Sequence, residues 1–293
     1  RPGAETPRRI LAVILTHNAP DSLARCLVAI AGQTTPPEGI LVLDNASRPA
    51  AALPPPDLCP IPTQVVRSEV NTGPAGGYAQ ALGEFVESGF LHAWVLDDDM
   101  VPDPSCLEHL WAVAGRDPER AFVFPVSQQV DGSLGVWPSW CGFVISRQIV
   151  EAVGLPIKEL FWWAEDTEYL QWRIPEAGFT RHVANEAVVH HDAVRQGSGV
   201  PLWKYYYESR NMLYVHLHVK RRVGWYPRNI TRLLARSVFR ERSGRVRRLS
   251  VIARGLSDGA RGRLGLRFPI EPMIEDPDGS SALADHRRRA DGR

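Results

Sequence analysis

Three consecutive aspartates, Asp97, Asp98 and Asp99, follow the apolar run "LHAWVL" and precede a turn containing Pro102. Adjacent carboxylates repel one another, and oxygen ligands suit Mg²⁺ or Mn²⁺. Magnesium sites commonly combine one or two carboxylates with substrate phosphates, so a cation here would hold a diphosphate. The alternative is that one aspartate caps the turn and the others are solvated. The cluster thus predicts a divalent metal site, with a turn cluster as the competing interpretation.

A glycine-rich stretch, "NTGPAGGYAQ", begins at Asn71. Gly73, Gly76 and Gly77 would allow the backbone to approach a ligand closely, and the following helix would offer its first N–H groups to an anion. The spacing differs from the GxGxxG pattern of dinucleotide folds, and the sequence contains no GxxxxGK[ST] loop. The stretch predicts contact with a phosphate, and a turn used only for packing is the alternative.

A second acidic group lies in "FWWAEDTEYLQWR", where Glu165 and Asp166 open an expected helix. Acids in a first helical turn complement the helix dipole, so capping is the simpler interpretation. Trp162 and Trp163 come directly before them, and their faces could stack on a sugar ring. A carboxylate beside such a platform could act as a general base. We expect this carboxylate to be exposed, with a pKa of about 4, and therefore to be a weak base.

Two adjacent histidines, His190 and His191, follow the run "AVV". Side chains alternate along a strand, so only one of the two can face a given site. Neutral imidazole is a common metal ligand. One histidine is therefore expected to complete the ligand set of the aspartates, and the sequence leaves the choice open.

These residues must be positioned by the elements before them. Apolar runs and helical patterns alternate through the first hundred residues, which predicts an α/β fold with a doubly wound, parallel sheet. The expected strands are "ILAVIL", "GILVLD", "TQVVR" and "LHAWVLD". Polar clusters follow each run, and ligands bind at the carboxyl ends of such strands. Later strands, in "AFVFPVSQQ", "CGFVIS" and "TRHVANEAVVHHD", are expected to close the sheet with mixed directions.

Composition indicates an ordinary globular protein: of 293 residues, 44% are hydrophobic and 23% charged. The apolar runs are strand-sized, far short of the roughly 20 residues of a membrane span.

The four cysteines lack zinc spacing, which predicts reduced thiols in a cytoplasmic protein. Residues 1–9 have no apolar signal core and are expected to form a tail. Residues 271–293 lack apolar periodicity and are expected to be disordered.

Charge is unevenly distributed, although the net charge is only +1. Residues 220–267 hold 15 basic and two acidic residues, a net +13, which leaves −12 for the remainder. Arginines recur every fourth residue beside apolar ones, at Arg228, Arg232, Arg236 and Arg240. This predicts a basic amphipathic helix that lies on an anionic membrane surface. A solvated helix packed on the main domain is the alternative, and nucleic acid is not expected because no recognition module accompanies the charge.

The motifs "THN", "LDN", "NTGPAGGY", "LDDD", "WWAEDTEY", a later histidine and "SRN" occur in this order between Ile10 and Tyr214. In this the chain resembles the inverting nucleotide-sugar glycosyltransferases of family 2, particularly bacterial galactofuranosyltransferases and rhamnosyltransferases. The resemblance implies a GT-A fold, a mixed and mainly parallel sheet flanked by helices. It also implies a catalytic domain over residues 10–205 and a basic helical extension over 206–270.

The resemblance implies a role for each matching residue. The catalytic base would be Asp166. The nucleotide and donor would contact Thr16, Asn18, Asp44, Asn71, Gly77 and Asp98. The metal, Mn²⁺ or Mg²⁺, would be bound by Asp97, Asp99 and His190, with His191 as the rival ligand. The acceptor would contact Trp140, Trp162, Trp163 and Glu165, the last standing where many relatives have aspartate.

The function implied is metal-dependent transfer, with inversion, of a sugar from UDP-galactofuranose or a similar UDP- or dTDP-sugar. The acceptor would be a hydroxyl of a glycan, a glycolipid or a natural product. Lipid-linked acceptors would favour a cytoplasmic enzyme at the inner face of the plasma membrane. The alternatives are a dTDP-rhamnose transferase and a non-catalytic sugar-binding protein. A nucleotidyltransferase is disfavoured because "LTHNAPDS" replaces its basic glycine-rich loop, and a retaining mechanism because no second nucleophile adjoins the aspartates.

Overall fold

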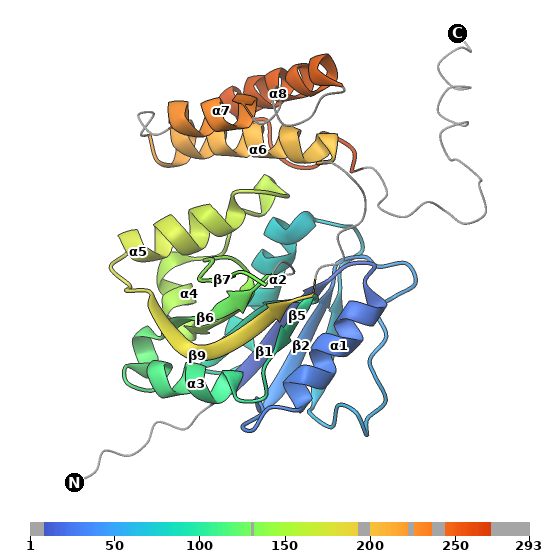
Figure 1. Ribbon diagram of the computed structural model, residues 1–293, viewed down its shortest axis with the longest axis vertical. Coiled ribbons are helices and arrows are strands. Elements are labelled where there is room, and N and C mark those ends of the chain that lie inside the picture. Colours follow the sequence, from blue (N-terminus) through green and yellow to red (C-terminus); the bar gives the residue numbers. More distant parts are fainter. Residues whose placement is uncertain (1–8, 130–131, 193–199, 222–225, 236–243, 271–293) are drawn as a thin grey trace.

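The computed structural model describes residues 9–129, 132–192, 200–221, 226–235 and 244–270. These residues form one nine-stranded sheet with helices on both faces and a group of C-terminal helices beyond it (Figure 1). The strands are β1 (Ile10–Thr16), β2 (Gly39–Asp44), β3 (Thr63–Arg67), β4 (His92–Asp97), β5 (Met100–Pro102), β6 (Phe122–Gln128), β7 (Leu134–Gly135), β8 (Cys141–Ser146) and β9 (His182–His191). The α-helices are α1 (Pro20–Ala31), α2 (Gly73–Glu87), α3 (Cys106–Ala114), α4 (Arg147–Val153), α5 (Ile174–Glu176), α6 (Leu202–Tyr214), α7 (Tyr226–Ala235) and α8 (Arg245–Ala260).

The sheet has the strand order β3-β2-β1-β4-β8-β6-β9-β5, with β7 paired to β6. The four N-terminal strands are parallel neighbours, β4, β6 and β8 pair antiparallel, and β9 runs parallel to β6. In this register Thr16 lies opposite Asp44, and Leu15 lies opposite Asp97. The polar ends of β1, β2 and β4 therefore meet at one edge. The predicted α/β class and mixed sheet are confirmed.

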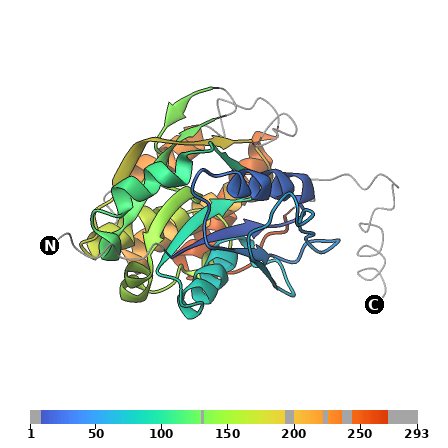
Figure 2. The same ribbon diagram turned by 90° about the horizontal axis from the view of Figure 1, so that it is seen from below.

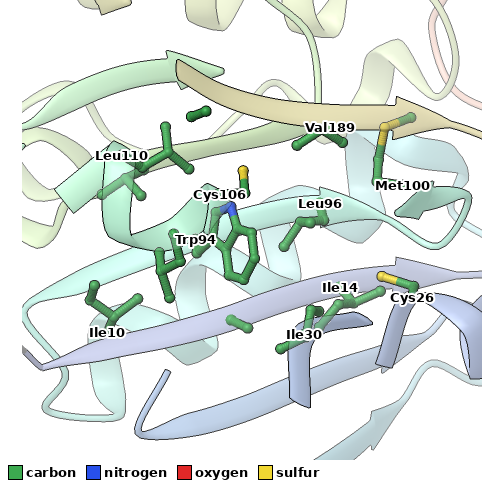
Figure 3. Packing of buried hydrophobic residues seen from close by; sticks show 14 of the residues in the cluster. Ile10, Ile14, Cys26, Ile30, Trp94, Leu96, Met100, Cys106, Leu110 and Val189 are labelled. Carbon is green, nitrogen blue, oxygen red and sulfur yellow. The ribbon is translucent and has the colours of Figure 1, made fainter. Parts of the chain in front are cut away.

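Helices cover both faces of the sheet because each presents an apolar stripe at helical spacing (Figure 2). On one face, α1 and α3 share a core with the sheet, in which Trp94, Cys106 and Leu110 lie together, and α3 lies against β6, β8 and β9 (Figure 3). On the other face, α2 and α4 contribute Tyr78, Leu82 and Ile149 to a second core. Two local features differ from the sequence prediction. Residues after the aspartates form β5, which pairs with β9, and the segment Thr167–Arg173 is a π-helix.

The C-terminal helices form a layer above the sheet, with α6 packed on α8 and α7 beside them (Figure 1). Close contact is possible because α8 carries two glycines at this interface. A Cβ at Gly255 would lie 2.1 Å from Ser209 Oγ, and one at Gly259 would lie 2.3 Å from Arg210 O. The expected domain boundary after residue 205 falls inside α6.

The predicted basic amphipathic helix coincides in part with α7, which includes Arg232. Arg236 and Arg240 lie outside the described residues, as does the side chain of Arg228. None of the helices described is long and apolar enough to cross a membrane. All four cysteines are free thiols, as predicted.

Candidate active site at the carboxyl edge of the sheet

The loop after β1 is fastened to the loop after β2. His17 Nδ1 lies 2.8 Å from Asn45 O, and Asn18 Oδ1 accepts a hydrogen bond of 2.7 Å from the Arg48 amide. Asn18 itself has a φ of 53°, a left-handed conformation that asparagine tolerates better than most residues. The amide of Asn18 donates to Ser47 Oγ. Asn18, predicted to contact the nucleotide, thus lies at the rim of the sheet and is held by local hydrogen bonds.

Asp44 is only 1% exposed and is fully engaged within the protein. Its carboxylate accepts hydrogen bonds from the amides of Ser47 (2.8 Å) and Ala51 (3.0 Å) and from Arg67 Nη1 (2.5 Å). Burial alone would raise the pKa of Asp44, but these hydrogen bonds and the guanidinium lower it below its usual value. Asp44 therefore anchors the loop after β2 and orients the half-exposed Arg67. The sequence reading missed Arg67.

Asn45, also missed in the sequence, connects the end of β2 to the glycine-rich turn. Its side-chain oxygen accepts from the Thr72 amide (3.0 Å), and its side-chain nitrogen donates to Gly73 O (3.1 Å) and to Asn71 Oδ1 (3.2 Å). Asn71 Oδ1 also accepts from the amide of Gly73. The predicted donor-side Asn71 is therefore a partly buried member of a network that shapes the start of α2.

The glycines of this turn have packing roles. Gly73 has a φ of 66°, and a Cβ there would lie 2.1 Å from Phe161 O. Gly77 is buried, and a Cβ there would lie 2.5 Å from Leu15 Cδ1. The structure thus places Gly77 at the contact between α2 and β1, as the packing alternative predicts.

The three aspartates point to different partners. Asp97 Oδ1 accepts a short hydrogen bond from the hydroxyl of Tyr78, and Asp98 Oδ2 accepts one of 2.6 Å from Thr16 Oγ1. Asp99 Oδ1 is buried and has no hydrogen-bond partner among the described residues. Burial and the charge of Asp99 together raise the pKa of Asp97 well above its usual value. The same two causes, opposed by the hydrogen bond from Thr16, raise the pKa of Asp98 to about 7.

The two histidines face opposite ways, as strand alternation predicts. His191 Nε2 lies 3.1 Å from Asp99 Oδ2, whereas His190 Nε2 lies 2.8 Å from Asp103 Oδ1. The hydrogen bond to Asp99 raises the pKa of His191. The structure therefore brings His191, the alternative metal ligand, to the aspartate cluster. It pairs His190, the metal ligand that the resemblance implies, with a carboxylate outside the cluster.

The oxygen and nitrogen ligands at this edge of the sheet are of the kinds that bind divalent cations, but they are not grouped as a metal site. Among the residues described, no three His, Cys, Asp or Glu side chains are grouped so that they could hold a metal ion. Asp99 nevertheless has a buried carboxylate oxygen without a partner, and an imidazole lies beside its other oxygen. Two such protein ligands suit Mg²⁺ or Mn²⁺ bound together with substrate phosphates. The residues present therefore fit a cation of this class.

The second acidic group lies close to the aspartates through Trp140. Trp140 O accepts from the Asp97 amide (2.9 Å), and its ring stacks on Tyr78 with centroids 3.9 Å apart. Trp140 is only 3% exposed. Its indole N–H lies near Glu165 and acts to lower that residue's pKa without completing a hydrogen bond. The structure thus makes Trp140 a buried bridge between the two acidic groups, with no ring face open to an acceptor.

Glu165 and Asp166 are not the exposed carboxylates expected from the sequence. Glu165 is 5% exposed and its Oε2 is buried without a partner, while Asp166 is half-buried and accepts from the Thr167 amide (2.5 Å). Burial raises the pKa of both groups, and the charge of Asp166 raises that of Glu165 further. The expectation of an exposed carboxylate with an ordinary pKa is wrong, because burial withdraws both carboxyl groups from water.

Trp162 and Trp163 lie on the other side of the acid pair and are partly exposed. Both pack against an aromatic core formed with the C-terminal helices, in which the rings of Trp162 and Trp203 meet edge to face at 4.7 Å. The negative charge of Glu165 also contributes to the raised pKa of Asp97. The acid pair therefore lies close to the aspartates, whereas Trp162 and Trp163 pack toward the C-terminal helices.

Comparison with known proteins bears on this arrangement. The chain is 34% identical over 93 residues to galactofuranosyltransferase GlfT1 of Mycobacterium tuberculosis, a match that covers 31% of this chain and 30% of the relative. It is 27% identical over 205 residues to GlfT1 of Mycolicibacterium smegmatis, covering 58% and 66%. The chain thus matches from less than a third to about two thirds of the length of these relatives.

Two solved structures share the fold. One is GalNAc-T7, crystallised with UDP, GalNAc and Mn²⁺, with a TM-score of 0.52, 15% identity and coverage of 78% of this chain and 55% of that one. The other is S. aureus TarS 1-349, with a TM-score of 0.51, 13% identity and coverage of 87% and 83%. The family model described as glycosyl transferase family 2 matches residues 11–176, more than half of the chain. The chain therefore belongs to glycosyl transferase family 2, which confirms the predicted family and its glycosyltransferase class.

Proposed function

We propose that this protein transfers a sugar from a nucleotide diphosphate donor to an acceptor hydroxyl, with inversion and with the help of Mn²⁺ or Mg²⁺. The observation that carries the proposal is the meeting of two acidic groups at one sheet edge, Asp97 to Asp99 beside His191 and Glu165 with Asp166. One group suits a diphosphate with its cation, and the other suits an acceptor. GalNAc-T7, which shares the fold, binds UDP and Mn²⁺ in its crystal structure, in support.

On the donor side, we propose that Thr16, Asn18, Asn71 and Asp98 border the nucleotide. Thr16 and Asp98 are joined by a hydrogen bond of 2.6 Å, so they would act as one unit toward the ribose or sugar. Asp44 would act indirectly, because its oxygens are occupied and it holds Arg67 at the rim.

Asp99 and His191 would hold the cation, and Asp97 would join them when it turns from Tyr78. A divalent cation bound there supplies charge neutralisation for the departing diphosphate. His191 keeps its orientation through Gln129, whose Oε1 lies 3.1 Å from Nδ1. Tyr78, packed on Trp140, keeps Asp97 at the end of β4.

Asp166 is the proposed general base. It would take the proton of the acceptor hydroxyl as that oxygen attacks the anomeric carbon from the face opposite the leaving group, and a single displacement inverts the configuration. Burial raises the pKa of Asp166, which makes it a stronger base than a solvated aspartate. Glu165 would be protonated at neutral pH and would leave Asp166 as the charged member of the pair.

UDP-galactofuranose is the donor that we favour, because the curated relatives are galactofuranosyltransferases. Another UDP- or dTDP-sugar, including dTDP-rhamnose, is the second candidate. The acceptor would be a hydroxyl of a glycan or of a lipid-linked glycan.

We also propose that the C-terminal helices contact the inner face of the plasma membrane from the cytoplasm. On α8 the apolar side chains of Val246 (82% exposed) and Leu249 (37% exposed) project beside exposed Arg245 and Arg247. The one acid in residues 244–270, Asp258, is buried against the Tyr206 hydroxyl and lies 3.8 Å from Arg263 Nη1 and from Arg267 Nε, at the other end of α8 from Arg245 and Arg247. Co-sedimentation with anionic vesicles, but not with neutral ones, at low salt would support contact. Retention in the supernatant would contradict it.

The first experiment titrates UDP and dTDP calorimetrically into the wild type and Asp99→Ala, with and without Mn²⁺. Mn²⁺-dependent binding of one nucleotide that is lost in Asp99→Ala would support the donor and the metal together. Absence of binding of either nucleotide under all conditions would leave the aspartates as a turn cluster and overturn the proposal. Transfer by the wild type but not by Asp166→Asn then separates an enzyme from a sugar-binding protein.

A further inference from the structure

The backbone that carries the acid pair is held in an unusual conformation. Phe161, Trp163 and Ala164 have φ values of 64°, 78° and 70°, in the left-handed region that residues other than glycine rarely adopt. This segment leads directly into Glu165 and Asp166. Such conformations persist only when surrounding contacts determine them. The question is which contacts hold this segment.

Asn211, on α6, supplies three of them. Its side chain is fully buried, and its Nδ2 lies within hydrogen-bonding distance of three carbonyl oxygens, those of Leu160 (2.9 Å), Trp162 (2.6 Å) and Trp163 (2.7 Å). An amide nitrogen has two N–H groups, so three carbonyls share two donors. These bonds join residues 48 to 51 positions apart in the chain, and they act on the turn that precedes Glu165.

Arg210 fixes the orientation of that amide. Its Nε donates to Asn211 Oδ1 (2.7 Å), which leaves Nδ2 as the group that faces the turn. Its Nη2 donates to Leu160 O (2.7 Å), and its Nη1 donates to Gly265 O (2.5 Å). The guanidinium also lies over the ring of Tyr207, at 4.7 Å from the centroid. Arg210 is fully buried, so this orientation is determined by packing as well as by hydrogen bonds.

The opposite side of the same turn is held by the start of α2. Phe161 O accepts a hydrogen bond of 3.1 Å from the Ala75 amide. The same carbonyl oxygen occupies the space that a Cβ at position 73 would need, so only glycine fits there. The turn is therefore held between the proposed diphosphate side of the site and α6.

We infer that Asn211, oriented by Arg210, is a positioning residue that sets the place of the proposed base. It lies outside residues 11–176, the part matched by the family model. The C-terminal helices therefore complete the active site in addition to any membrane contact. The kinetic part of this inference rests on the proposed function, but the structural part does not.

The test compares Asn211→Asp with Ser209→Ala. The aspartate has the shape of asparagine and keeps an acceptor for Arg210, but it has no N–H donor and places a carboxylate against three carbonyl oxygens. Ser209 is buried on the same helix, and its hydroxyl bonds, among the described residues, only α6 and α8 carbonyls, including Ile252 O (3.3 Å), so it controls for general damage to the helix pair.

Amide hydrogen exchange is measured by mass spectrometry on a peptide covering residues 160–168. We expect faster exchange in Asn211→Asp and no change in Ser209→Ala. We also expect kcat to fall about 100-fold in Asn211→Asp, the effect of a displaced catalytic group, with KM for the donor and UDP binding close to wild type. Asn211→Ser, which keeps one hydroxyl donor, should be intermediate, and it carries the test if the aspartate variant does not fold.

Unchanged exchange in the Asn211 variants, or equal changes in Ser209→Ala, would overturn the inference. So would loss of kcat and UDP binding in parallel, because that result indicates a general structural role. If the wild type transfers no sugar, the proposed function fails by itself, and the exchange comparison still decides whether Asn211 holds the turn.

Discussion

His191 Nε2 lies 3.1 Å from Asp99 Oδ2, while the neighbouring His190 bonds to Asp103. The two imidazoles are one residue apart and reach different carboxylates because strand side chains alternate between faces. Only His191 is therefore positioned to share a cation with Asp99.

The histidine pair provides the sharpest test of the metal site. Replacing His191 by alanine should weaken Mn²⁺-dependent UDP binding by about 10- to 100-fold or more, since loss of ligands or their supporting groups has effects of this size. His190→Ala is the matched control and should leave binding close to wild type, because His190 pairs with Asp103 outside the aspartate cluster. Calorimetric titration with and without Mn²⁺ measures both, and a larger loss in His190→Ala would reverse the assignment.

The acid pair should separate chemistry from donor binding. Asp166→Asn removes the proposed base, and a general base contributes about 10²- to 10⁴-fold in rate. We therefore expect kcat to fall by that factor while UDP affinity stays near wild type. Glu165→Gln, which mimics a protonated glutamate, should retain far more activity. A Glu165→Gln variant as inactive as Asp166→Asn would show that the ionised glutamate takes part.

Burial of Glu165 should also be visible in the pH dependence of stability. Burial raises its pKa from the ordinary 4.5 to about 8, so between these values the folded protein holds a proton that the unfolded chain releases. The stabilisation is complete below about pH 4.5 and is lost as pH rises toward 8. In the wild type, this loss lowers the free energy of unfolding by up to about 1.4 kcal/mol per pH unit. Glu165→Gln should not show the loss, because glutamine does not ionise.

Urea unfolding of both proteins from pH 5 to 8.5, with chelator present, measures the difference directly. The stability of the variant relative to the wild type should increase steadily with pH. Parallel curves would mean that Glu165 ionises in the folded protein as readily as in water.

Replacing two glycines of α2 by alanine should change the stability of the protein in opposite directions. In Gly77→Ala the new methyl group would lie 2.5 Å from Leu15 Cδ1, and overpacking of this kind costs about 1–3 kcal/mol. In Gly83→Ala it would lie 3.6 Å from Leu155 Cδ1, an ordinary contact, and the helix should gain about 0.5–1 kcal/mol. Thermal unfolding of both variants checks this, and an undisturbed Gly77→Ala would mean that α2 can move away from β1.

Much of the fold could be predicted because its causes are local. The alternation of apolar runs with helical stripes predicts the four parallel strands. The polar residues at their carboxyl ends, such as Thr16 and Asp97, must lie at one edge because parallel strands end there together. The short β5 was missed because Met100 to Pro102 forms a strand only by pairing with β9, far along the chain.

The sequence by itself determined which residue types reach the site. Aspartates, an acid pair and a histidine pair follow predicted strands or open a predicted helix, and their spacing places them at one edge. The tertiary structure decided what each group does there. It turned His191 rather than His190 toward Asp99, buried Trp140 between the two acidic groups, and raised the pKa of Glu165 by removing water. It also brought Asn211 to the turn before the acid pair. These outcomes depend on burial and on contacts between residues far apart in the chain, and local sequence patterns carry neither.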